Sequence, residues 1–101
     1  MPFVKVGSVS ALAPNSVQEV AIGENYYAIC NVEGRIRALG GVCPHRGGPL
    51  GQGNVRYGIL ICPWHAWGFD PETGESDEDP TKHVAAYDVK VEGDDILIQI
   101  P

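Results

Sequence analysis

The sequence predicts an all-β fold, an antiparallel sandwich or a small barrel made of short strands. Two observations support this fold class. Apolar and polar residues alternate over short stretches, and these stretches are separated by turns drawn from 13 glycines and 8 prolines in 101 residues. No stretch of useful length shows the i, i+3, i+4 apolar spacing of a helix, and the short run from Ala11 to Ala13 is stopped by Pro14.

Two hairpins are the clearest elements of this fold. The first joins Tyr26 to Val32 with Arg35 to Leu39, and its turn falls at Glu33-Gly34, where glycine tolerates a positive φ. In the second, residues 87–92 and 96–100 alternate in polarity on either side of a Gly-Asp-Asp turn. Four shorter strands are expected at Phe3 to Val6, Val17 to Ile22, Val55 to Tyr57 and Ile59 to Ile61.

Length, charge and cysteine content limit the kind of protein. A chain of this size is expected to form one domain, residues 1–101, around one core. Its net charge of −6 argues against binding to nucleic acid, which needs clustered lysine and arginine. The chain begins without a signal-peptide pattern and has no apolar run of about 18 residues that could span a membrane. Because the three cysteines also suit a reducing compartment, we expect a soluble, cytoplasmic protein.

Two short motifs carry the chemistry of the chain, Cys43-Pro44-His45 and Cys62-Pro63-Trp64-His65. Each offers one thiolate and one imidazole, and together the four side chains would bind a transition metal. Structural zinc sites usually group a cysteine pair apart from a histidine pair, whereas here each motif has one of each. This division favours a two-iron cluster in which one iron takes both cysteines and the other takes both histidines. A single structural zinc ion is the alternative.

With their flanking residues, Cys43 to Leu50 and Cys62 to Asp70, the motifs resemble those of the Rieske [2Fe-2S] family. The resemblance implies a Rieske-type antiparallel β-sandwich or small barrel that holds one [2Fe-2S] cluster at the tips of two loops, about residues 43–53 and 62–70. It also implies that Cys43 and Cys62 hold the inner iron as thiolates. His45 and His65 would hold the outer iron, and the electron would enter and leave at this histidine edge.

The same resemblance suggests how the loops surround the cluster. Glycines of the first loop are expected to let backbone N–H groups approach the cluster sulfurs, although simple turn formation explains them equally well. These glycines are Gly47, Gly48, Gly51 and Gly53. Pro80 is expected to belong to a third loop beside the cluster.

Two departures from the respiratory branch of the family predict a low reduction potential. Gly48 and Trp64 occupy the positions of that branch's extra cysteines, so no disulfide can join the two loops. Trp67 and Phe69 stand where that branch has a serine and a tyrosine, whose hydroxyls raise the potential by hydrogen bonding to sulfur. We therefore expect a potential on the order of −150 to −100 mV.

Several residues outside the ligand set receive less specific predictions. Cys30 is expected to be buried in a strand, and His83 is expected at the surface and not as a ligand. The aromatic residues Trp64, Trp67 and Phe69 are expected to shield the cluster and pack the core. The alternative is that Trp64 or Trp67 forms the apolar centre of a docking surface.

Acidic residues crowd into the stretch from 70 to 79, just after the second motif. Such a run suits a solvated loop, and it equally suits electrostatic steering toward a basic face of a redox partner. Its members are Asp70, Glu72, Glu75, Asp77, Glu78 and Asp79. The sequence does not decide whether Arg46 contacts a partner or an acidic side chain.

The resemblance implies a one-electron carrier between an NAD(P)H-dependent flavoprotein ferredoxin reductase and a terminal oxygenase, as in aromatic-ring-hydroxylating dioxygenase systems. Two alternatives remain open: the small Rieske-like subunit of an assimilatory NADH nitrite reductase, bound to its large subunit, and a zinc-binding interaction module. We do not expect an enzyme. The mononuclear iron of an oxygenase needs two further histidines and a carboxylate, and His83 is the single histidine left over.

Overall fold

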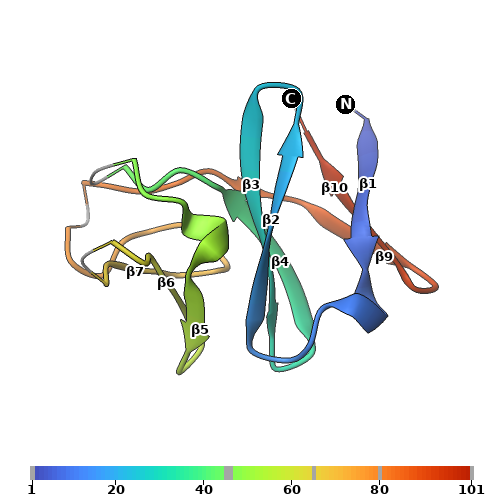
Figure 1. Ribbon diagram of the computed structural model, residues 1–101, viewed down its shortest axis with the longest axis horizontal. Helices are drawn as coiled ribbons and strands as arrows, with labels where there is room; N and C mark the ends of the chain where they lie inside the picture. The colour runs from blue at the N-terminus through green and yellow to red at the C-terminus, as the bar shows by residue number, and fades with distance from the viewer. Residues whose placement is uncertain (1, 45–46, 65, 80, 101) are drawn as a thin grey trace.

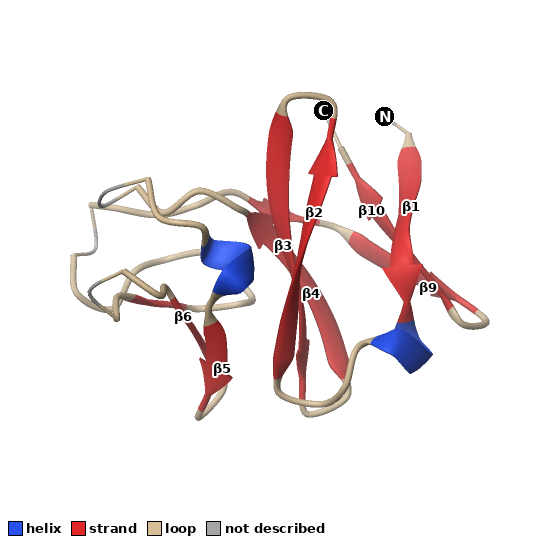
Figure 2. Ribbon diagram, viewed as in Figure 1, coloured by secondary structure: helices blue, strands red, loops and turns tan. Residues whose placement is uncertain are grey.

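The structure is a computed structural model that describes residues 2–44, 47–64, 66–79 and 81–100. Nearly all regular structure in these residues is β, with two short 3-10 turns, η1 and η2 (Figure 2). In chain order the elements are β1 (Phe3–Ser8), η1 (Val9–Ala11), β2 (Ser16–Ile22), β3 (Asn25–Val32), β4 (Arg35–Gly40), η2 (Leu50–Gln52), β5 (Asn54–Arg56), β6 (Ile59–Ile61), β7 (Gly68–Phe69), β8 (Ala86–Tyr87), β9 (Val89–Glu92) and β10 (Asp95–Gln99). The all-β prediction is confirmed.

Three antiparallel sheets lie side by side (Figure 1). The central sheet has the strand order β2-β3-β4-β8. On one side of it lies the sheet β1-β10-β9, and on the other lies the small sheet β5-β6-β7 with the loops that carry the two motifs. The candidate metal centre therefore belongs to an outer layer of the molecule, and the central sheet supports it.

Strand β3 divides the apolar interior into two cores because its side chains alternate across the central sheet. Ala28, Cys30 and Val32 face the core beneath the motif loops, and Tyr27 and Ile29 face the core under β1, β9 and β10. We call these the cluster-side core and the base core. The cluster-side core also contains Leu39, Cys43, Leu50, Val55, Leu60, Cys62, Phe69 and Val84, and the base core contains Leu12, Ile36, Ala38, Ile96 and Ile98.

The β3–β4 hairpin is present with the expected turn. In the β3–β4 turn, Glu33 and Gly34 have φ of 52° and 95°, the left-handed pair that matches the twist of a two-residue hairpin. The strand expected to end at Tyr57 ends at Arg56 instead, because Tyr57 has φ 53° and forms the β5–β6 turn with Gly58.

The C-terminal hairpin is present as β9–β10, but its turn has two residues, Gly93-Asp94, because Asp95 already pairs with Glu92. The β9–β10 pairing sets Val91 opposite Ile96 and Val89 opposite Ile98, as the alternation predicts. The strand expected over 87–92 is interrupted at Asp88, since Tyr87 pairs with Ala38 in the central sheet as part of β8.

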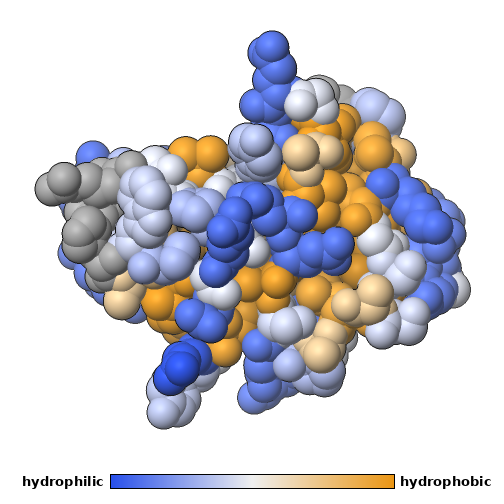
Figure 3. Space-filling model, viewed as in Figure 1, coloured by the Kyte–Doolittle hydropathy of each residue, from blue (hydrophilic) through white to orange (hydrophobic). Residues whose placement is uncertain are grey.

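Among the described residues, no helix is long and apolar enough to cross a membrane. On the face shown in Figure 3, apolar areas lie on either side of hydrophilic residues that cross the middle of the molecule, and further hydrophilic residues lie at the margins.

Candidate metal centre

The two motif cysteines lie directly after strands that belong to different sheets. Cys43 follows β4 after a short Gly41-Val42 segment, and Cys62 follows β6 without a gap. Both side chains are only 1% exposed, and they belong to the cluster-side core. Both cysteines therefore lie close to strand ends, while His45 and His65 lie outside the described residues.

Backbone hydrogen bonds fix the direction of each cysteine. The Cys43 N–H donates to the Gly48 carbonyl at 2.8 Å, and the Gly47 N–H donates back to the Cys43 carbonyl at 2.8 Å, which closes the first loop into a compact turn. In the second loop the Cys62 N–H donates to the Trp67 carbonyl at 2.7 Å. Main-chain hydrogen bonds therefore hold the cysteine of each loop. Because these bonds involve no side chain, a side-chain substitution in the loop would leave their donors and acceptors in place.

Cys43 and Cys62 are neighbours in the cluster-side core. Burial raises the pKa of Cys62, and the hydrogen bond to the neighbouring Cys43 thiol adds to this effect, although the Trp64 N–H bond to the sulfur opposes it. Cys43 and Cys62 are both free thiols, with no disulfide between them. Two buried thiols side by side cannot both ionise without a cation, and metal binding would release both protons and neutralise the pair.

These two cysteines fit half of the predicted ligand set. No group of three or more histidine, cysteine, aspartate or glutamate side chains is placed to hold a metal in the part of the chain that the structure describes. Two sulfur ligands from two loops would suit one iron of a two-iron cluster. The second pair of ligands, His45 and His65, remains a prediction.

Gly48 and Trp64 contact each other across the two loops. A Cβ built on Gly48 would lie 3.0 Å from the Cys62 Sγ and 3.1 Å from the Trp64 ring carbons. The Trp64 side chain is 49% exposed, so one face of the indole covers the glycine and the other meets solvent. Gly48 and Trp64 occupy the positions at which the respiratory branch has its disulfide cysteines. These two positions therefore do face each other here, and an apolar contact joins them.

Two other loop glycines have a packing role that the sequence analysis did not include. A Cβ on Gly51 would lie 2.7 Å from the Glu19 Cα in β2, and a Cβ on Gly53 would clash with the Ile61 carbonyl in β6. The Gly53 N–H also donates to the Leu50 carbonyl at 3.1 Å. Close packing of the first loop on strands β2 and β6 requires these glycines, and the sequence cannot show it because the neighbours are remote in the chain.

The acidic stretch is largely tied into the structure. Glu72 forms salt bridges with Arg35 at 3.1 Å and Arg37 at 2.8 Å, and these partners lower the pKa of Glu72. Asp79 bonds to the hydroxyl and N–H of Thr81, which lowers the pKa of Asp79. The solvated-loop interpretation therefore explains at least these carboxylates.

One carboxylate pair in this stretch lies against the second motif loop. Glu78 accepts a hydrogen bond from the Gly68 N–H at 3.0 Å, and the Asp77 N–H donates to the Gly68 carbonyl at 3.1 Å. The hydrogen bond from Asp77, together with partial burial, raises the pKa of Glu78. This pair fastens the segment before Pro80 to β7, although Pro80 itself lies outside the described residues.

The remaining predictions for single residues are mostly confirmed. Cys30 is fully buried, and burial raises the pKa of its thiol to about 11, so it stays protonated. His83 is exposed, as expected. Phe69 is completely buried and Trp67 packs partly against the same core, whereas Trp64 is half exposed. Arg46 lies outside the described residues.

The fold and the buried cysteine pair define a class of small β proteins that hold a metal centre between two loops. The family model for the Rieske [2Fe-2S] domain matches residues 2–94. The chain therefore belongs to the Rieske [2Fe-2S] family, and its cofactor is one Rieske-type [2Fe-2S] cluster.

Individual relatives agree with this assignment. The chain is 32% identical over 97 residues to the ferredoxin component of the alkene monooxygenase system of Xanthobacter autotrophicus, covering 95% of this chain and 80% of the relative. It is also 32% identical to apoptosis-inducing factor 3 of Mus musculus, but there the match covers 90% of this chain and only 15% of that much longer protein.

Solved structures share the fold. The ferredoxin of carbazole 1,9a-dioxygenase from Nocardioides aromaticivorans superposes with a TM-score of 0.88 and 25% identity, covering 97% of both chains. A Mycobacterium tuberculosis protein assigned as an NADH-dependent nitrite reductase small subunit superposes with a TM-score of 0.87, covering 99% of this chain and 96% of that one. Its identity is 20%, so this second likeness supports the fold alone.

Proposed function

We propose that this protein is a Rieske-type ferredoxin, a one-electron carrier for a terminal oxygenase. The observation that carries the proposal is the 32% identity to an oxygenase-system ferredoxin over 95% of this chain and 80% of that relative. Two buried cysteines from two loops support the same function, because they supply the thiolate half of a Rieske ligand set. The bound cluster would supply reversible one-electron redox chemistry.

The proposal assigns the four ligands as the sequence predicts. Cys43 and Cys62 would hold one iron, and His45 and His65 would hold the other. Residues 1–101 would act as one domain with no catalytic site of its own. We propose an NAD(P)H-dependent flavoprotein reductase as the electron donor. Because this donor uses pyridine nucleotides of the cytoplasm, we also propose that the carrier is cytoplasmic.

Analysis of the purified protein tests the proposal directly. We expect a reddish-brown protein with two irons and two acid-labile sulfides per chain, and an electron paramagnetic resonance signal after addition of one electron. A colourless protein with one zinc ion would contradict it and support the zinc module. Reduction by a flavoprotein reductase and reoxidation by an oxygenase would separate the oxygenase ferredoxin from a nitrite reductase subunit, which would form a stable complex with a large subunit instead.

The histidine ligands can be tested by substitution. His45→Cys adds negative charge at the outer iron, so the oxidised state should gain stability and the reduction potential should fall. Protein-film voltammetry measures the change, and His83→Cys is the matched control because this exposed histidine lies outside both motifs. If His45→Cys leaves the potential and the visible spectrum unchanged, His45 is not a ligand.

A further inference from the structure

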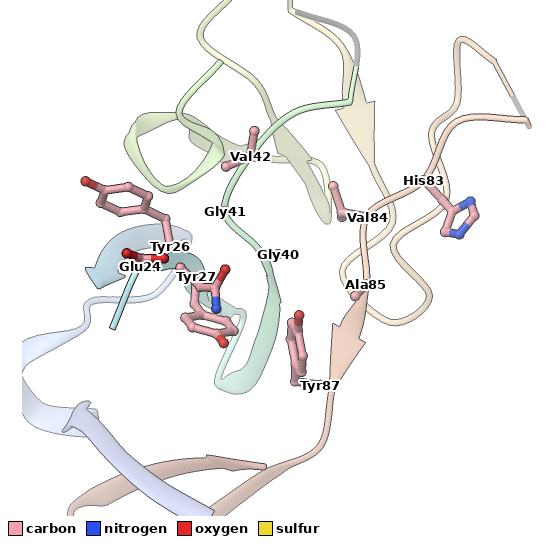
Figure 4. A pocket seen from close by; sticks show the side chains of 11 residues that line it. Glu24, Tyr26, Tyr27, Gly40, Gly41, Val42, His83, Val84, Ala85 and Tyr87 are labelled. Carbon is pink, nitrogen blue, oxygen red and sulfur yellow. The ribbon is translucent and has the colours of Figure 1, made fainter. Parts of the chain in front are cut away.

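A second possible binding site lies beside the first motif loop. It is a pocket of about 400 Å³ between the start of β3, the end of β4 and the segment that leads into β8 (Figure 4). Three tyrosines, Tyr26, Tyr27 and Tyr87, line it, and we call it the tyrosine pocket. Gly41 and Val42, which lead directly into Cys43, form part of its wall.

The aromatic rings of the pocket are firmly placed. Tyr27 is 3% exposed, and its ring meets the Tyr87 ring edge to face with centroids 5.1 Å apart. Burial raises the pKa of Tyr87, so its phenol is neutral under physiological conditions. Tyr26 is 50% exposed and lines the same pocket.

The charge on the lining is negative. Among the described lining residues, Glu24, from the β2–β3 turn, is the one carboxylate and there is no lysine or arginine, and His83 points its ring away from the pocket in Figure 4. Within the described part of the chain, Glu24 forms no salt bridge. Neutral aromatic rings beside an unpaired carboxylate form an environment that attracts organic cations.

We propose that the tyrosine pocket receives an arginine or lysine side chain of the redox partner and anchors that partner beside the cluster loop. This inference rests on the proposed function, since it needs a protein that exchanges electrons with this chain. Charge complementarity favours such an occupant, because the pocket carries a carboxylate and the whole chain has a net charge of −6.

The position of the pocket suits docking of this kind. Val42 is 52% exposed and forms the edge shared by the pocket and the first motif loop. A partner whose cationic side chain fills the pocket would therefore lie next to the first motif loop. Tyrosine and arginine are also the residue types that most often dominate binding energy at protein interfaces.

A small probe tests the pocket independently of electron transfer. Holoprotein with isotope-labelled tyrosine rings is titrated with Nα-acetylarginine methylamide, and nuclear magnetic resonance follows the ring signals. We expect saturable shifts at Tyr26 and Tyr87. The citrulline analogue, which has the same shape without the charge, should cause shifts at least threefold smaller at equal concentration.

Two substitutions and two matched controls complete the test. Glu24→Gln and Tyr26→Leu should each raise the dissociation constant of the arginine probe at least threefold. Glu33→Gln, at the opposite end of β3, and Tyr57→Leu, at the fully exposed β5–β6 turn, should leave it unchanged.

Several results would overturn the inference. Equal shifts with the citrulline probe would show that the pocket does not select a cation. The absence of saturable shifts at Tyr26 and Tyr87 would show that the pocket does not bind the cation. Saturation by the free probe at micromolar concentration would identify a site for a small cationic molecule instead of a docking anchor. None of these results would affect the iron content or the one-electron chemistry, so failure of this inference is distinct from failure of the proposed function.

Discussion

Gly48 shows how a single missing methyl group shapes the metal centre. Its backbone passes so close to the Cys62 Sγ that an added Cβ would lie 3.0 Å from it, tighter than ordinary van der Waals contact. Gly48→Ala should therefore cost about 1–3 kcal/mol of folding free energy through overpacking. It should also lower the iron content per chain, because the Cys62 sulfur must move. Thermal unfolding and iron analysis measure the two effects.

Gly7→Ala is the control for this substitution. A Cβ on Gly7 would lie 3.5 Å from the Gln18 side chain, an ordinary contact in a strand remote from the motifs. Its stability and iron content should match the wild type. If Gly48→Ala behaves in the same way as Gly7→Ala, the two loops are not closely packed at this point.

The sequence predicted the residues that act through their own chemistry better than those that act through packing. Cys43 and Cys62 were identified because thiolates at this spacing have few other uses, and the structure places both in the cluster-side core. The packing roles of Gly51 and Gly53 were missed because their neighbours, Glu19 and Ile61, are brought close only by the fold. The tyrosine pocket was missed for the same reason, since its walls come from three separate segments.

At the scale of elements, a buried amide joins the β3–β4 hairpin to the segment that precedes β2. Asn31 is 4% exposed; its Nδ2 donates to the Leu12 carbonyl at 2.9 Å and its Oδ1 accepts from the Gly34 N–H at 2.7 Å. Asn31→Ala would leave the buried Leu12 carbonyl without this donor, at a cost of about 1–3 kcal/mol. The melting temperature should fall by roughly 5–20 °C for a domain of this size.

The exposed Asn54, at the start of β5, provides the control for Asn31. Asn54→Ala should shift the melting temperature by no more than about 3 °C, since surface changes of this kind are usually within 0.5 kcal/mol. Equal melting temperatures for the two variants would mean that the Asn31 bonds do not stabilise the hairpin.

A second link between elements is electrostatic and depends on pH. Glu72, in the segment after β7, pairs with Arg35 and Arg37 on β4, and the pairing lowers the pKa of Glu72 from its ordinary value of 4.5. The stabilisation is therefore complete above about pH 4.5 and is lost as the pH falls through the lowered value. Because Glu72 is 42% exposed, Glu72→Gln should cost about 0.2–1 kcal/mol at pH 7 and low salt.

Denaturant unfolding at several pH values measures this effect. The difference between Glu72→Gln and wild type should decrease as the pH falls below about 4.5 and shrink in 1 M salt, where the Debye length is about 3 Å. Glu92→Gln is the control: Glu92 pairs with Lys90 on its own strand, so that salt bridge links no separate elements. A difference that is independent of pH would show that packing, and not the ion pair, holds the segment to β4.

The elements themselves were mostly predictable, because alternation and glycine turns are local signals. The β3–β4 hairpin and the strand before Cys62 have the expected positions. The strand expected over 87–92 is divided between β8 and β9, because Tyr87 pairs with β4 in the central sheet. The two-residue strand β7 was missed, because a strand this short has no measurable periodicity and depends on its partner β6. Sequence alone also gave no sign that the interior divides into two cores.

At the scale of the whole molecule, this division predicts how the protein responds to loss of its metal. Cys43 and Cys62 belong to the cluster-side core, whereas the base core contains no residue of either motif. Removal of iron would leave two buried thiols without a cation, and the loops that carry them would lose a link between β4 and β6. The base core would keep every one of its contacts. Iron removal should therefore loosen one side of the central sheet and leave the other side folded.

Amide hydrogen exchange before and after anaerobic iron chelation tests this expectation. Exchange should accelerate at least tenfold in β5, β6 and β7, and it should change less than about twofold in β1, β9 and β10, because local openings have separate free energies. Strand β3 provides an internal comparison, since Ala28 and Cys30 face one core and Tyr27 and Ile29 face the other. Uniform acceleration in all strands would contradict the two-core description, because it would mean that the metal centre and the base unfold as one cooperative unit.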